Sequence, residues 1–282
     1  EVVEATQHLM DNPDAEVSDL VKFVKGPDFP TGAVIYGGPG LVSAYETGRG
    51  SVTVRGVAEI VDEGKNGMQI VITEIPYGLN KATFIEKIAD LVVTKKITSI
   101  SDIRDQTARG GVKIVIYLKR DAYPSKVLNQ LYKMTPLQSS FSFNMLALID
   151  GVQPQVLNLK RILEEFIKHR RVVIRRRTEF ELRAARARAH ILEGLKIAID
   201  NIDEVIKIIR ASESSDVAQT SLMERFKLSE IQSKAILDMP LRRLAALERQ
   251  KIEDELKALL LLIADLEAIL ADTKKIDKII KD

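Results

Sequence analysis

The sequence predicts a mixed α+β domain followed by an all-α part, a long antiparallel coiled-coil hairpin that ends in a small helical dimerisation tip. Two observations predict this fold class. Short β-branched segments bounded by Gly, Pro or Asp alternate with amphipathic segments until about residue 150. Beyond that point only helical spacing remains, in two long apolar stripes that are separated by about 40 residues.

Composition narrows the class of protein. The chain has 282 residues, of which 45% are hydrophobic, so it is long enough for two or three domains with their own cores. The absence of Cys predicts a reducing, cytoplasmic location and excludes disulfides and thiolate-bound metals. No apolar run reaches the roughly 20 residues that cross a bilayer, so no membrane partner is expected. The chain opens on Glu1 rather than Met, and we expect a piece of a longer protein.

Residues 1–30 are predicted to form a helical lead-in and a linker. Asn12-Pro13 separates two short helices, and "GPDFPTG" (26–32) is a connection rich in Pro and Gly. The lead-in carries seven acidic and two basic side chains. Its charge is therefore opposite in sign to that of a basic segment later in the chain.

Residues 31–156 form the predicted α+β domain. Helices are expected at 80–97 and 124–134, where apolar residues recur at helical spacing and Pro124 stands at the start of the second helix. Short connections between strands and helices favour an α+β arrangement. The predicted strands are "AVIYG" (33–37), "GSVTVRGVAEIV" (50–61), "MQIVITEI" (68–75), "GVKIVIYLK" (111–119) and "SFSFNMLALI" (140–149).

Two long helices are predicted to form the hairpin, an outgoing helix over 157–200 and a returning helix over 241–282. Steps of three, four and seven residues keep each apolar stripe on one helical face. The outgoing stripe is Leu159, Ile162, Phe166, Val173, Phe180, Ala184, Ala187, Ile191, Leu195 and Ala198. The returning stripe is Leu241, Leu244, Ile252, Leu256, Leu259, Ile263, Leu266 and Leu270.

The segment between them, residues 201–240, is the predicted tip. Asn201 with Glu204 and Ser229 with Gln232 have the spacing of a capping box. The tip holds more apolar side chains than so small a unit buries by itself, which predicts a two-fold self-interface in addition to a core. The candidate interface residues are Ile236, Leu237, Met239, Leu241 and Leu244. Tip helices are expected at 202–210, 216–226 and 229–238.

A basic segment lies on the outgoing helix. Between Lys168 and Arg188 nine Lys or Arg face two Glu, a local charge of +7 in a chain whose net charge is +2. A solvated helix face explains this pattern, and so does transient attraction of a polyanion. No groove-reading motif accompanies the segment, so sequence-specific DNA recognition is not expected. The arginines placed opposite the stripe on a helical wheel are Arg171, Arg175, Arg176, Arg183 and Arg186.

Motifs in every predicted element resemble a known family. They include "GPDFPTG" (26–32), "AYETGRGSVTVR" (44–55), "TEIPYGLNKATFIEKIADLV" (73–92), "LNQLYKMTPLQSSFSFNMLAL" (128–148), "RRRTEFELRAARARAHILEGL" (175–195) and "QSKAILDMPLRRLAALE" (232–248). These segments resemble the A subunits of bacterial type IIA topoisomerases, those of DNA gyrase first and those of topoisomerase IV more distantly. The sequence departs from the family pattern at Gly78-Leu79, at "FSFNM" and at Pro240.

The resemblance implies a tower domain, a coiled-coil arm and an exit gate where two A subunits meet. Such enzymes pass one duplex through a transient break in another, and gyrase thereby introduces negative supercoils with the energy of ATP. The family nucleophile is a tyrosine in an Arg-Tyr-Thr context, which none of the six tyrosines here has. ATP and Mg²⁺ are expected on the partner B subunit of an A2B2 assembly. No catalytic or metal-binding residue is therefore expected in this chain, whose three His are dispersed.

Double-stranded DNA is the partner that the resemblance implies. Arg49, Arg55 and Lys81 are candidate contacts of the tower domain to DNA phosphates, or else ordinary exposed cations. The arginines of the outgoing helix are expected to line a passage for the transported duplex without reading its sequence. A coiled-coil chromosome scaffold is the rival class, but it does not explain the α+β domain.

Overall fold

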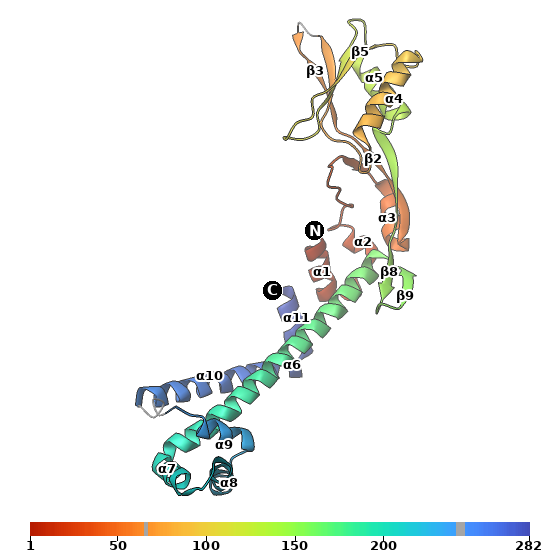
Figure 1. Cartoon of the computed structure of the whole chain (residues 1–282). Coiled ribbons are helices and arrows are strands. Elements are labelled where there is room, and N and C mark those ends of the chain that lie inside the picture. The colour runs from red at the N-terminus through yellow and green to blue at the C-terminus, as the bar shows by residue number, and fades with distance from the viewer. Residues whose placement is uncertain (65–66, 241–245) are drawn as a thin grey trace. The chain divides into compact units, whose positions relative to one another are not determined.

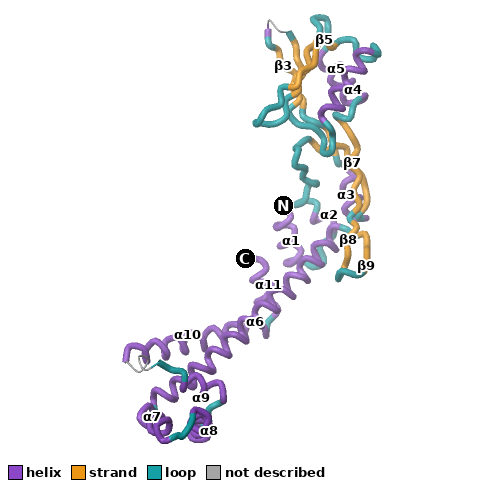
Figure 2. The backbone as a smooth tube through the Cα atoms, viewed as in Figure 1, coloured by secondary structure: helices purple, strands orange, loops and turns teal. Residues whose placement is uncertain are grey.

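The computed structural model describes residues 1–64, 67–240 and 246–282. It divides into two compact units, Glu1–Phe166 and Ile167–Asp282. Strands occur in the first unit, and the described part of the second unit is helical (Figure 2). The predicted fold class, a mixed α+β domain followed by a helical hairpin with a small helical tip, is confirmed.

The first unit begins with helices that pack near a three-stranded antiparallel sheet of order β1-β2-β7. Val52 and Val54 are buried on one face of its central strand, and α3 packs against that strand. The elements are α1 (Val2–Asp11), α2 (Val17–Leu20), β1 (Val34–Tyr36), α3 (Gly38–Thr47), β2 (Arg49–Arg55) and β7 (Gln138–Asn144).

The glycines of the "TGRG" motif allow α3 to pass directly into β2. Gly48 ends α3 with a φ of 76°, a left-handed conformation that favours Gly, and an added Cβ would collide with the Leu157 carbonyl. Gly50 lies directly against Ala44 of α3, where a side chain would also collide. The motif is therefore explained by backbone conformation and close packing.

A second sheet has four antiparallel strands in the order β3-β4-β6-β5 and is covered by two helices. Alternate residues of the central strands, Ile70 with Ile72 and Ile114 with Ile116, point to one face and are fully buried. Phe84 and Leu131 of the helices complete this core. The elements are β3 (Ala58–Asp62), β4 (Met68–Ile72), α4 (Lys81–Val93), β5 (Ile100–Asp105), β6 (Ile114–Leu118) and α5 (Pro124–Met134). A separate hairpin, β8 (Leu146–Ile149) with β9 (Gln153–Val156), follows.

Three elements of this unit were not predicted: α3, β5 and β9. The α3 segment opens with "GPG", which is typical of a turn, yet Pro39 stands at the start of the helix, where Pro is tolerated. β5 is polar because it is an edge strand of the sheet with exposed charges. β9 contains Pro154, a residue that is uncommon within strands, but this two-stranded hairpin accepts Pro on its edge.

The second unit is an antiparallel helical hairpin with three short helices near one end of α6 (Figure 1). Ion pairs show that the returning helices run antiparallel to α6. Residues later in α6 pair with residues earlier in the returning helices: Arg171 with Asp277, Arg186 with Glu267 and Arg188 with Glu255. The elements are α6 (Leu159–Asp200), α7 (Ile202–Ala211), α8 (Ser215–Phe226), α9 (Glu230–Leu237), α10 (Ala246–Ala271) and α11 (Thr273–Lys281).

The buried face of α6 differs from the predicted stripe by about one residue. Phe180 is 65% exposed, and Val173 and Ala187 are exposed as well. The buried positions in the middle of the helix are Ile174, Thr178, Leu182, Ala185 and Ala189. A rotation of one residue is about 100° on a helix, so the predicted position was wrong for Arg171, which lies on the buried side and pairs with Asp277. Arg176 and Arg183 are exposed and lie opposite the buried positions. The returning stripe was predicted correctly at Ile252, Leu256 and Leu266.

Side-chain hydrogen bonds determine where several helices of the second unit begin. Ser229 and Gln232 form the predicted capping box at the start of α9. The box predicted at Asn201 is absent, because Asn201 donates its side-chain N–H to Ile197 and Glu204 pairs with Arg225. The returning helix is divided at Asp272, whose carboxylate accepts the Lys274 N–H and starts α11.

Candidate nucleic-acid interface

Arg55, a candidate DNA contact at the end of β2, is held inside the first unit. Its guanidinium carbon lies 4.4 Å from the ring centre of Tyr36 and 4.5 Å from that of Tyr132. Its Nε donates to Gln138 Oε1 at 2.8 Å, across the β2–β7 pair. Arg55 therefore stabilises the sheet through stacking on two rings and a hydrogen bond across two strands.

Lys81 and Arg49, the other two candidates in this unit, also have partners. Lys81 Nζ lies 2.7 Å from Asp105 Oδ2, and this contact, together with the hydrogen bonds from Thr107, lowers the pKa of Asp105 to about 2. Arg49 Nε donates to Asn144 Oδ1 at 3.3 Å, so it is held more loosely. Its guanidinium is exposed, which leaves its other donors available to a ligand.

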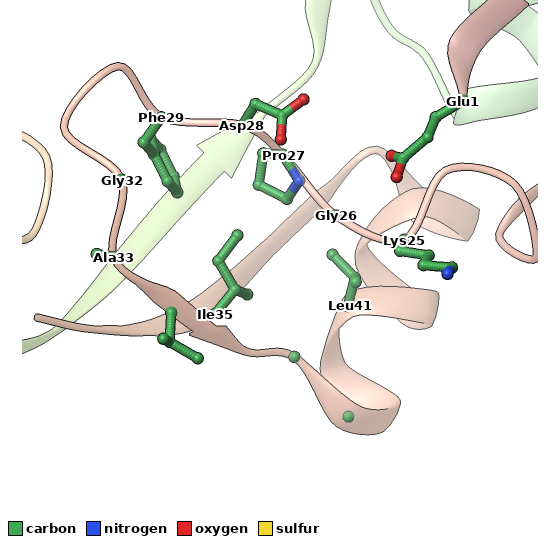
Figure 3. Close-up of a pocket in the computed structure, with 13 residues that line it drawn as sticks. Glu1, Lys25, Gly26, Pro27, Asp28, Phe29, Gly32, Ala33, Ile35 and Leu41 are labelled. Carbon is green, nitrogen blue, oxygen red and sulfur yellow. The ribbon is translucent and has the colours of Figure 1, made fainter. Parts of the chain in front are cut away.

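The "GPDFPTG" linker docks on the "EIPY" segment. Glu74 accepts the backbone N–H of Ala33 at 2.5 Å, next to Gly32, and both Gly32 and Ala33 have positive φ. Phe29 stacks on Tyr77 with ring centres 5.7 Å apart. The linker and the "EIPY" segment, both part of the family resemblance, thus pack against each other. A cavity of about 480 Å³ lies beside the linker, lined also by β1 and the start of α3 (Figure 3).

The arginines of α6 divide into two groups. Arg171 and Arg186 form ion pairs with Asp277 and Glu267 of the returning helices, at 2.6 Å each. Arg175, Arg176 and Arg183 are exposed and have no ion-pair partner among the residues that the structure describes. The first group connects the helices of the hairpin, and the second keeps its charge available to a polyanion.

The predicted interface residues of the tip lie partly in its core. Ile236 is only 3% exposed, while Leu237 and Met239 are partly buried against the same core and line a hollow of about 300 Å³. Leu241 and Leu244 lie outside the described residues. The apolar side chains of the tip that are exposed instead are Ile209, Val217 and Ile231, the last of them at 62%.

Two tyrosines have pKa values that make them poorer nucleophiles. Burial raises the pKa of Tyr45, and burial also raises that of Tyr132, whose hydroxyl donates to the Gly56 carbonyl. A tyrosine that attacks phosphorus needs its proton removed, which burial opposes. In residues 1–64, 67–240 and 246–282 no group of three or more His, Asp and Glu side chains is placed to hold a metal, and no helix is long and apolar enough to span a membrane.

A polar contact between α6 and α9 was not predicted from the sequence. His190 Nε2 lies 2.7 Å from Ser229 Oγ, and Gln232 Nε2 donates to the His190 carbonyl at 2.7 Å. Gln232 packs directly against Gly194 of α6, where an added Cβ would lie 2.7 Å from Gln232 Cβ. The sequence signal was a lone Gly in a long helical pattern, which often marks close packing.

The whole chain, residues 1–282, matches the family model that describes the A subunits of DNA gyrase and topoisomerase IV. Curated relatives that are named as A subunits of DNA gyrase are similar over the full chain: 55% identical in Clostridium acetobutylicum, 54% in Halalkalibacterium halodurans and 51% in Staphylococcus epidermidis. The chain spans 34%, 34% and 32% of these relatives, about a third of their length.

Proposed function

We propose, because the chain belongs to the family of DNA gyrase and topoisomerase IV A subunits, that it is the tower, arm and exit-gate part of a gyrase A subunit. The observation that carries this proposal is the similarity to gyrase proteins of that name at more than half of all positions and over the full length of the chain. In the proposed enzyme the A subunit cleaves and rejoins double-stranded DNA in the cytoplasm. The B subunit of an A2B2 assembly supplies ATP hydrolysis and Mg²⁺.

A supercoiling assay tests this proposal. The complete A subunit, assembled with its B subunit, is expected to introduce negative supercoils into relaxed plasmid when ATP and Mg²⁺ are present. Efficient separation of linked circles without supercoiling would assign the chain to topoisomerase IV instead. Loss of both activities in a folded assembly would overturn the proposal.

The exposed arginines of α6 are proposed to guide the transported duplex. Arg175, Arg176 and Arg183 offer phosphate-binding charge on a helix face that the described residues leave open. Contacts to phosphates attract any duplex and carry no sequence information. The role is therefore one of passage, separate from cleavage of the first duplex.

A charge-matched comparison tests that role. Replacing Arg175, Arg176 and Arg183 with Gln in the complete enzyme is expected to slow supercoiling while cleavage of the first duplex is retained. The control removes three exposed lysines from the returning helices, Lys257, Lys274 and Lys275. Equal supercoiling rates for the two triple variants would mean that the arginines form an inert solvated face.

The chain is proposed to be inert alone. None of its tyrosines has the Arg-Tyr-Thr context of the family nucleophile, and burial raises the pKa of two of them. Incubation of the chain with supercoiled plasmid, Mg²⁺, ATP and a cognate B subunit is expected to leave the DNA unchanged. A covalent adduct between this chain and DNA would show that the nucleophile lies within it.

A further inference from the structure

We infer that α6 carries a docking face for an acidic amphipathic helix of a partner protein. This face is a ledge, defined as Val173, Phe180, Ala184 and Ala187, all of which are exposed. The four residues belong to the second unit and to the single helix α6 (Figure 1). Docking on the ledge requires neither DNA cleavage nor supercoiling, so it goes beyond the proposed function and does not rest on it.

The ledge is an apolar row along one face of α6. Val173, Phe180 and Ala187 are spaced seven residues apart, and Ala184 lies one turn beyond Phe180, so the four side chains share a helical face. On a helical wheel this face lies roughly 150° from the centre of the buried face. The described residues of the other helices leave it uncovered, since Phe180 is 65% exposed and Val173 is 37% exposed.

Phe180 is explained neither by a solvated helix face nor by the passage of DNA. Burial of a phenylalanine side chain contributes roughly 1.5–3 kcal/mol, which an exposed ring forgoes. The phosphate backbone of a duplex binds arginines but offers nothing apolar to a phenyl ring. Single exposed apolar residues are common on protein surfaces. Here the large ring lies in a row with three further apolar side chains, which is the pattern of a helix that pairs with another helix.

The charge beside the ledge selects an acidic partner. Five arginines and two glutamates lie in residues 173–187. Arg176 and Arg183 border the ledge on one side, are exposed and have no ion-pair partner among the described residues. Arg177 borders the other side, where Glu181 lies 3.9 Å away and both side chains are about half exposed. Residues that flank an apolar row form ion pairs between paired helices, so a fitting helix has Asp or Glu beside its own apolar row.

The dimensions of the ledge define the size of the partner helix. From Val173 to Ala187 the ledge extends about 21 Å at 1.5 Å per residue, so the partner helix needs at least about 15 residues, or four turns. Ala184 and Ala187 have small side chains, which leaves room beside Phe180 for Leu or Ile side chains of the partner.

Two other occupants fit the ledge less well. A second copy of α6 would place the arginines that border one ledge against those that border the other, and like charges at an interface disfavour binding. Anionic membranes also bind basic amphipathic helices, which bury a large apolar face among the lipids. The ledge is a narrow row with alanine at two of its four positions, so it offers little apolar surface for insertion.

The test uses three fluorescent synthetic peptides of about 21 residues, or three heptads. The Glu peptide has Leu at heptad positions a and d and Glu at positions e and g, where the like charges keep it from pairing with itself. The Lys peptide has Lys in place of each Glu, and the scrambled peptide has the composition of the Glu peptide without the heptad order. In fluorescence anisotropy with the complete A subunit, only the Glu peptide is expected to bind.

Substitutions in the A subunit separate the apolar contact from the charge. Phe180→Ser is expected to weaken binding of the Glu peptide about tenfold with little change in Tm, and Phe180→Leu to retain most of the binding. Leu261→Ser is the matched control, because Leu261 of α10 is 67% exposed, and it is expected to leave binding unchanged. Arg176→Glu together with Arg183→Glu is expected to exchange the preference, so that the Lys peptide binds and the Glu peptide does not.

Several results would overturn the inference. Equal binding of the Glu peptide by wild type and Phe180→Ser would do so, as would equal binding of the Glu and Lys peptides or no binding of the Glu peptide at all. Binding to the 282-residue chain but not to the complete A subunit would mean that another segment of that subunit covers the ledge. Vesicles of phosphatidylglycerol and phosphatidylcholine that bind wild type but not Phe180→Ser would assign the ledge to a membrane.

Discussion

Arg55 lies between the rings of Tyr36 and Tyr132 and bonds Gln138 across the sheet. Arg55→Lys keeps the positive charge but loses the planar stacking and the Nε hydrogen bond. We expect the free energy of unfolding of the chain to fall by about 1 kcal/mol, measured by urea denaturation. Arg49→Lys, at an exposed position of the same strand, is the control and is expected to change it by less than about 0.5 kcal/mol. Equal stability of the two variants would mean that the stacking and the hydrogen bond of Arg55 do not stabilise the fold.

Asp105 has a pKa of about 2, lowered first by its hydrogen bond with Lys81. The unfolded value is about 3.9. A carboxyl whose folded pKa is depressed stabilises the fold above its unfolded pKa and loses that contribution as the pH falls through the folded value. Wild type is therefore expected to be more stable than Asp105→Asn, with the largest difference in unfolding free energy above about pH 4 and a smaller one as the pH falls toward 2. Denaturation at several pH values measures it.

Lys81→Met provides the complementary test of that pair. In this background Asp105→Asn is expected to produce a much smaller change with pH, because the principal partner of the carboxylate is gone. A pH-dependent difference of undiminished size would show that the contacts to Thr107, and not Lys81, determine the pKa.

At the scale of elements, periodicity predicted most helices and strands but chose the wrong face of α6. Both faces of this helix carry apolar residues. The exposed one holds the large Phe166 and Phe180, whereas the buried one holds Ile174 and Leu182 together with Thr178 and small alanines. Apolar residues on both faces leave the helical wheel ambiguous, and only packing against the other helices identifies the buried side.

The candidate site was predictable in its charge and not in its contacts. The sequence identifies Arg55, Lys81 and the α6 arginines as cations, but their partners lie far away along the chain. Tyr132, Asp105 and Asp277 meet them only after the fold is formed. Single-sequence reasoning therefore could not separate the cations that stabilise the fold from those that remain available to DNA.

The contact between α6 and α9 depends on Gly194. An added Cβ would lie 2.7 Å from Gln232 Cβ, and Gln232 is buried and bonded to His190. In an open helix, Gly→Ala stabilises by up to about 1 kcal/mol. Here we expect Gly194→Ala to destabilise by about 1–3 kcal/mol, because the packed neighbour has to move. Urea denaturation measures the sign, and Gly40→Ala, with only an ordinary contact at 3.7 Å, is expected not to destabilise.

Arg188 and Glu255 fix the register of the hairpin through two hydrogen bonds, of 2.7 and 3.0 Å. Both side chains are about two-fifths exposed, so solvent screening limits the pair to about 0.5–1 kcal/mol. Each single charge reversal, Arg188→Glu or Glu255→Arg, is expected to lower Tm, and the double reversal to restore most of the loss. Additive losses in this double-mutant cycle would mean that the pair contributes no coupling.

At the scale of the whole molecule, both units expose cations and apolar side chains. Lys119 and Arg120 of the first unit and Arg176 and Arg183 of α6 are exposed cations, and Leu148 of the first unit and Ile231 of the tip are exposed apolar side chains. Charge without partners attracts a polyanion, whereas exposed apolar side chains favour association of proteins. In the proposed enzyme we expect the cations to face DNA and the apolar side chains of the tip to face a second copy of the chain.

Self-association through the tip is therefore expected to depend on exposed residues and not on the core. Ile231→Asp, at a position that is 62% exposed, is expected to abolish dimerisation in analytical ultracentrifugation while helicity and Tm stay near those of wild type. Ile236→Asp is expected to unfold the tip, because it places a charge where the side chain is only 3% exposed. A second exposed substitution, Val217→Asp, tests whether the interface extends onto α8. A wild-type chain that is monomeric at micromolar concentration would contradict the expectation, and an Ile231→Asp variant that still dimerises would place the interface elsewhere on the tip.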